Sequence, residues 1–298
     1  MNKKPFFPWP LQGLFMVVIL WLAACSSSPT LTKEERQSKI LYGQGTSELM
    51  QKEYANAISH LEQANELTPG DSKILNNLAM AYYFKKQTAT AIDYLQKSLA
   101  ADAKNQDARS NLATIYMEQK KFDQALATYH QVLEDVTYPK QHVTHYNIAK
   151  LYLAQDKKGA AIQELKLALE EDPDYCQANY TLGQMYAQDH RYQQALDCFK
   201  KSASGACIRN IDGHYQQALM QIELRHFTEA RSILRDIIEH YTQEERYLSL
   251  ANEALRKLDR LAPESEVDRI KSRWDKEQNK IWHAQKDATP TEFKTSNF

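Results

Sequence analysis

Small apolar residues recur along the chain in two columns with a common spacing. Each member of the second column follows its partner in the first by twelve residues, and successive repeats are separated by 34, 34, 36, 34 and 35 residues. Small side chains are needed where two helices cross closely, because a larger one would push them apart. The pattern therefore predicts a series of paired helices. The first column is Gly45, Ala79, Ala113, Ala149, Gly183 and Ala218, and the second is Ala57, Ala91, Ala125, Ala161, Ala195 and Ala230.

Large residues stand at matching positions, where they fill the space that the small ones leave. Tyrosines follow the first column by three residues, and leucine or an aromatic follows the second by four. Glu48 and Gln221 replace the tyrosine in the first and last repeats. The members are Tyr82, Tyr116, Tyr152 and Tyr186, then Leu61, Leu95, Tyr129, Leu165, Phe199 and Leu234.

This period and pattern resemble the tetratricopeptide repeat. The resemblance implies an all-α, right-handed superhelix of about six helix-turn-helix repeats, over residues 38–243. The periodicity that continues past His240 predicts capping and extension helices over 244–287, followed by a disordered tail over 288–298. An irregular helical bundle is the alternative. Only eight glycines and nine prolines occur in 298 residues, which suits a helical protein better than a turn-rich β-protein.

The N-terminus carries the pattern of a secretory signal. Lys3 and Lys4 precede an apolar run, residues 14–22, that is shorter than the ~20 residues needed to span a bilayer. The sequence Leu22-Ala23-Ala24-Cys25 that follows resembles the lipobox of bacterial lipoproteins. That resemblance implies a signal peptide over 1–24, acylation of Cys25 and a tether over 25–37. Ser26 after the cysteine implies the periplasmic face of the outer membrane. An ordinary signal peptide with a stray cysteine is the alternative.

The first helix of each tetratricopeptide repeat lines the concave face of the superhelix in this family. The resemblance therefore implies a partner-binding groove rich in aromatic residues and methionines, which favour protein contacts. The alternative is that these side chains pack between repeats or beneath the C-terminal helices. The residues are Tyr42, Leu49, Met50, Asn76, Met80, Tyr83, Phe84, Met117, Tyr146, Leu153, Tyr180, Tyr215 and Leu219.

Three cysteines remain after Cys25. Cys176 opens the first helix of the fifth repeat and Cys207 follows its second helix, so the two can approach bonding distance; three reduced thiols are the alternative. Cys198 lies within a helix and is expected to stay free. His142 and His145 lie one helical turn apart without an obvious carboxylate partner, so we expect surface residues and no metal site.

The sequence contains none of the common catalytic or phosphate-binding motifs, so we expect neither an enzyme nor a cofactor. The formal net charge of −1 provides no basic field for nucleic acid, and no small-molecule substrate is indicated.

The lipobox, the six repeats and a two-residue insertion around Tyr138 and Pro139 together resemble type IV pilus pilotins of the PilF/PilW/Tgl family. The Cys176/Cys207 pair resembles the disulfide of the Tgl-like branch. The resemblance implies an outer-membrane lipoprotein that binds a secretin subunit and promotes its outer-membrane localisation and multimerisation. One alternative is a periplasmic adaptor resembling NlpI, which scaffolds murein-processing enzymes. Another is a structural envelope subunit with no peptide groove.

Overall fold

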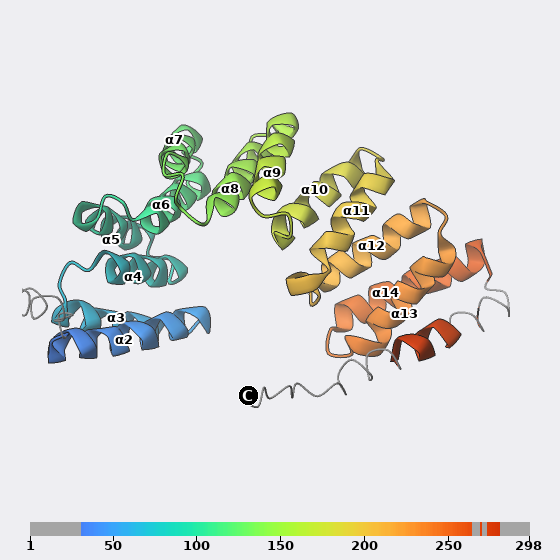
Figure 1. Ribbon diagram of the computed structural model, residues 1–298, viewed down its shortest axis with the longest axis horizontal. Helices are drawn as coiled ribbons and strands as arrows, with labels where there is room; N and C mark the ends of the chain where they lie inside the picture. Colours follow the sequence, from blue (N-terminus) through green and yellow to red (C-terminus); the bar gives the residue numbers. More distant parts are fainter. Residues whose placement is uncertain (1–30, 264–268, 270–272, 281–298) are drawn as a thin grey trace, which may run out of the picture. The chain divides into compact units, whose positions relative to one another are not determined.

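The computed structural model describes residues 31–263, 269 and 273–280, and this part of the chain is helical and contains no strand (Figure 1). The expected all-α fold is therefore confirmed. The signal peptide, Cys25 and the tail over 288–298 lie outside the described residues. The helices are α2 (Lys33–Met50), α3 (Tyr54–Leu67), α4 (Ser72–Phe84), α5 (Thr88–Ala101), α6 (Gln106–Glu118), α7 (Phe122–Leu133), α8 (Gln141–Ala154), α9 (Lys158–Glu171), α10 (Cys176–Gln188), α11 (Tyr192–Ser202), α12 (Ile211–Glu223), α13 (Phe227–His240) and α14 (Glu245–Leu261), with a 3-10 turn, η1, at Gly205–Cys207.

The two columns of small residues lie where the paired helices cross. Every alanine in both columns is fully buried, and so are the large residues that follow the second column. A Cβ atom on Gly45 would lie 2.6 Å from Cγ of Leu61, and one on Gly183 would lie 2.8 Å from the Phe199 ring. These contacts explain why the two repeats carry glycine at this position.

The turn between the two helices of a repeat has the same conformation in all six repeats. A non-glycine residue there takes a left-handed backbone with φ between 57° and 65°, and the next amide donates to a carbonyl five residues back. This pattern is a Schellman cap, which satisfies carbonyls at the end of the first helix. The six residues are Lys52, Lys86, Lys120, Asp156, His190 and Arg225.

The N-terminal unit, which ends at Ile115, contains the pairs α2/α3 and α4/α5. Helix α2 begins at Lys33, before the expected start of the array at residue 38, because Thr32 and Glu35 form a reciprocal capping box. Neighbouring helices are also joined by buried polar contacts. The Ser72 hydroxyl donates to the Ser98 carbonyl at 3.0 Å, and the Ser98 hydroxyl donates to the Ser72 carbonyl at 2.7 Å.

The C-terminal unit, which begins at Tyr116, contains the pairs α8/α9, α10/α11 and α12/α13. Helix α14 packs on α13 and α12, as a capping helix does. The nearly fully buried Arg231 of α13 holds its end by donating to Asp259 at 3.2 Å and to the Ala262 carbonyl. The helical residues 273–280 contact α13 through an ion pair of 2.8 Å between Lys276 and Glu239.

Candidate functional site

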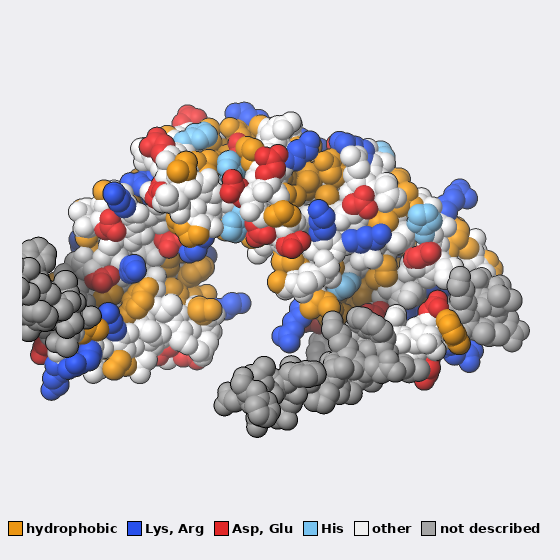
Figure 2. Space-filling model, in the orientation of Figure 1, with side chains coloured by type: hydrophobic (Ala, Val, Ile, Leu, Met, Phe, Trp, Pro, Cys, Tyr) orange, Lys and Arg blue, Asp and Glu red, His pale blue; other side chains and the backbone are white. Residues whose placement is uncertain are grey.

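The N-terminal unit exposes an aromatic patch made of Tyr54, Tyr83 and Phe84, and Met50 is exposed at the end of α2, four residues before Tyr54. The Phe84 ring stacks on Tyr54 with 5.1 Å between centroids, and Tyr83 contacts it edge-on at 5.2 Å. Met50 is 81% exposed and Phe84 is 42% exposed. Figure 2 shows hydrophobic side chains between charged ones over this unit. Large apolar side chains gathered in this way are typical of interaction surfaces.

The other residues expected to bind a partner from this unit have different environments. Tyr42 lines a surface pocket of about 440 Å³ near the start of α2, and Leu49 packs against the core. Met80 is half-buried. Asn76 departs from the expectation of an exposed contact: it is buried, and its amide oxygen accepts from Asn111 at 2.9 Å.

The C-terminal unit contains a pocket of about 340 Å³ whose walls include two tyrosines. Its lining comes from α8, α10, α12 and the residue before α12, and we call it the tyrosine pocket. Tyr146 contacts Tyr175 edge-on at 5.5 Å, and Tyr180 contacts the buried Phe199 ring at 5.7 Å. The lining residues are Tyr146, Cys176, Gln177, Tyr180, Thr181, Asn210 and Asp212.

Burial and nearby acids keep the tyrosines of this region protonated. Burial raises the pKa of Tyr175 to about 12, and Tyr146 and Asp172 add to the shift. Burial also raises the pKa of Tyr180, with a further contribution from Asp212. These hydroxyls therefore remain neutral hydrogen-bonding groups at physiological pH.

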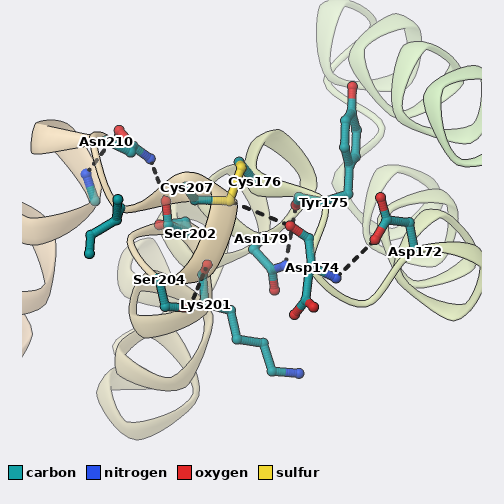
Figure 3. Close-up of a disulfide and its surroundings, with 12 residues drawn as sticks. Asp172, Asp174, Tyr175, Cys176, Asn179, Lys201, Ser202, Ser204, Cys207 and Asn210 are labelled. Atoms are coloured by element: carbon teal, nitrogen blue, oxygen red, sulfur yellow. Dashed lines mark hydrogen bonds between the residues drawn. A yellow bond between two sulfur atoms is a disulfide. The ribbon is translucent and has the colours of Figure 1, made fainter. Parts of the chain in front are cut away.

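Figure 3 shows a disulfide between Cys176 and Cys207. Because Cys176 lines the tyrosine pocket, the bridge lies at the edge of the pocket. The two Cα atoms are 5.8 Å apart, and the Cys207 sulfur lies 3.5 Å from the Asp174 carbonyl oxygen. The Asn210 amide donates to the Ser202 carbonyl at 2.8 Å. The bridge thus ties α10 to the segment that leads into α12, and so joins two walls of the pocket.

Cys198 on α11 is free and half-buried, and burial raises the pKa of its thiol to about 11.

The remaining predicted contacts of this unit are half-buried. Leu153 packs against the core around α8 to α11. Tyr215 and Leu219 line a pocket whose other wall is α14, and Tyr215 contacts Tyr247 of α14 with 6.4 Å between centroids. Helix α14 therefore covers part of the surface that was expected to face a partner. Met117, at the end of α6, is also half-buried.

The expectation that His142 and His145 lack carboxylate partners is wrong. His145 lies 2.8 Å from Glu164, and both side chains are mostly buried. His142 lies 3.9 Å from Asp172 and contacts the Tyr175 ring edge-on. Both histidines belong to the packing between helices. Among the described residues, no three histidine, cysteine or acidic side chains are placed to hold a metal ion.

Sequence profiles of the tetratricopeptide repeat match residues 42–106, 85–142 and 146–206, which together make up more than half of the chain. The chain is a tetratricopeptide repeat protein. Its fold is a protein-interaction module, so a protein partner is indicated. No helix in the described part has the length and apolar character needed to cross a bilayer.

Two solved tetratricopeptide repeat proteins share this fold. PilF of Pseudomonas aeruginosa is 17% identical, with a TM-score of 0.59, and the match covers 74% of this chain and 100% of PilF. PilW, a type IV pilus biogenesis factor, is 18% identical with a TM-score of 0.59, and the match covers 72% of this chain and 97% of PilW. At these identities the likeness shows a common fold.

A curated relative, the mitochondrial ALBINO3-like protein 3 of Arabidopsis thaliana, is 38% identical over 66 residues, 22% of this chain. The chain spans only 11% of the length of that relative.

Proposed function

We propose that this tetratricopeptide repeat protein is an outer-membrane lipoprotein pilotin, which binds the type IV pilus secretin and promotes its localisation and multimerisation. The observation that carries the proposal is the combination of an acylation motif ending at Cys25 with repeats that expose aromatic side chains. The fold supports it, because its likeness extends over all of PilF and nearly all of PilW.

The proposed mechanism needs no bond chemistry. Lipid on Cys25 holds the repeats at the periplasmic face of the outer membrane, since two or more acyl chains anchor a protein stably. The aromatic patch then holds an apolar segment of the secretin subunit, and the tyrosine pocket contacts the same subunit. Confinement of several subunits to one membrane surface raises their effective concentration for assembly.

The test is complementation of a strain that lacks the protein, with detergent-resistant secretin multimers as the readout. Phe84→Glu places a charge in the aromatic patch at a position that is 42% exposed, so the protein should stay folded while multimers are lost. The matched control is Leu167→Glu on α9, an exposed apolar position outside the patch, which should leave multimers unchanged. Cys25→Ser should remove palmitate labelling and multimers together.

Unchanged multimers in the Phe84→Glu strain would contradict a role for the aromatic patch. Capture of murein-processing enzymes in place of the secretin, from detergent-solubilised envelopes, would favour an adaptor resembling NlpI and overturn the pilotin proposal.

A further inference from the structure

The tyrosine pocket has one charged lining residue among those that the structure describes, Asp212 in the first turn of α12. The Tyr247 hydroxyl donates to one carboxylate oxygen, and no described basic side chain forms an ion pair with Asp212. Arg246 lies over the Tyr247 ring, 5.5 Å from its centroid. The pocket therefore offers a carboxylate that is oriented by a hydrogen bond and free to accept a further donor.

The surroundings of the pocket add negative charge on the side of α10. The segment before Cys176 reads Glu170-Glu171-Asp172-Pro173-Asp174-Tyr175, and Asp172 is close enough to raise the pKa of Tyr175. Two basic groups act on lining residues: Lys150 lies over the Tyr146 ring at 5.8 Å from the centroid, and Arg246 opposes the rise in the pKa of Tyr180. Neither basic group is part of the pocket lining, whose one charged residue among those described is Asp212, so the lining itself favours a cation.

We propose that the tyrosine pocket receives a basic side chain of the protein partner, with arginine preferred over lysine. The proposal rests on the function proposed above and specifies what its partner must carry. The guanidinium would pair with Asp212 and lie against the tyrosine rings, whose faces attract cations. This protein uses the same contact internally, since the Arg191 guanidinium lies 4.4 Å from the Tyr186 ring centroid.

The size and chemistry of the pocket support one long side chain as its occupant. A volume of about 340 Å³ is at the lower end of the range for small-molecule sites, about 300–1,000 Å³. An apolar side chain there would desolvate the Asp212 carboxylate without compensation, which is unfavourable. An acidic side chain would be repelled by Asp212.

The test uses two short acetylated peptides, Leu-Ala-Arg-Ala-Leu and the same peptide with citrulline, the uncharged isostere of arginine. Each is titrated into the folded repeat protein while the backbone amide signals of Gln177, Thr181 and Asn210 are followed by NMR. We expect the arginine peptide to bind about tenfold more tightly, because a charged hydrogen bond is lost with citrulline.

Asp212→Asn should abolish the preference for arginine. It keeps an oxygen that can accept from Tyr247, so the fold is retained. The matched control is Asp197→Asn, which makes the same charge change on the exposed side of α11, where Asp197 accepts from Gln193 at 3.1 Å. Equal binding of both peptides, or no shift at these amides up to about 1 mM peptide, would overturn the proposal.

A second measurement separates this proposal from the function on which it rests. Binding of the purified periplasmic region of the secretin is compared between the wild-type protein and Asp212→Asn. Weaker binding by Asp212→Asn supports the basic-residue site. Equal binding would overturn the site and leave the pilotin role intact. Absence of secretin binding by either protein, together with arginine-selective peptide binding, would overturn the pilotin role and leave the site.

Discussion

The replacement Gly183→Ala tests the packing rule on which the repeat architecture depends. Gly183 is buried in α10, and a Cβ atom there would lie 2.8 Å from Cε1 and 2.9 Å from Cδ1 of Phe199. Real Cβ contacts are longer, so either the ring or the helix must move. The ring has little freedom, because Phe199 is fully buried and also contacts Tyr180.

Two opposing effects determine how much Gly183→Ala changes the free energy of unfolding. Overpacking a buried site costs about 1–3 kcal/mol. Alanine in place of glycine inside a helix contributes about 0.5–1 kcal/mol in the other direction. The expected net loss of stability for Gly183→Ala is therefore between about 0 and about 2.5 kcal/mol. Gly159 in α9 is the matched control, since a Cβ there meets nothing within 4 Å. Gly159→Ala should raise the stability by about 0.4–1 kcal/mol.

Urea denaturation followed by circular dichroism measures both variants. A third variant, Gly183→Ala with Phe199→Leu, reproduces the Ala149/Leu165 pair of the preceding repeat, and should recover stability relative to the sum of the single changes. Contact between the two sites predicts a coupling energy above about 0.5 kcal/mol. Equal midpoint shifts for the two glycine variants, or strictly additive effects in the double variant, would refute the packing argument.

Three further predictions concern cysteine and tyrosine. Replacing Cys176 and Cys207 with serine should lower the free energy of unfolding by about 3–4 kcal/mol, measured by urea denaturation, because the bridge closes a loop with a sequence separation of 31. A midpoint unaffected by reductant would contradict this. Cys198, whose thiol has a pKa of about 11, should react with iodoacetamide at pH 8 only after denaturation; rapid labelling of the native protein would count against its burial. The folded pKa of Tyr175 lies above the unfolded value, so the stability from its neutral form is present below pH 10 and is lost as the pH rises toward 12. Tyr175→Phe should reduce this alkaline loss in pH-dependent unfolding, and an unchanged pH profile would contradict the assignment.

The helical scaffold could be predicted because the same kind of contact between two helices recurs in every repeat. A small residue and a large one must meet at every crossing, and period and residue size are both visible in the sequence. Even the departures have a physical explanation. Glu48 replaces the usual tyrosine and lies 2.8 Å from His60, while Gln221 accepts from His226 at 2.8 Å. In both repeats a polar pair substitutes for the ring.

The tyrosine pocket could be predicted only in part, because several of the residues that form it lie outside the repeat pattern. Tyr146 and Tyr180 occupy expected positions in first helices. Tyr175 precedes α10, and Asn210 and Asp212 lie around the start of α12. Their approach depends on the path of the segment between α11 and α12, which no period describes. The carboxylate partners of His142 and His145 were also missed, because both contacts join residues on different segments that no sequence spacing pairs.

Scaffold and recognition therefore place different demands on the same helices. The alanines of the two columns are fully buried. None of them can be replaced by a larger residue, because the larger side chain would separate two helices. Apart from the disulfide-bonded Cys176 and Asn210, the N-cap of α12, the residues of the tyrosine pocket are half-buried or exposed, and we expect that they can vary without loss of the fold. The disulfide contributes to both the fold and the proposed recognition, since it ties α10, which supplies Tyr180, to the segment that positions Asp212. A substitution that alters partner choice without unfolding the repeats should thus fall at Asp212 or on the pocket tyrosines, and not in the columns.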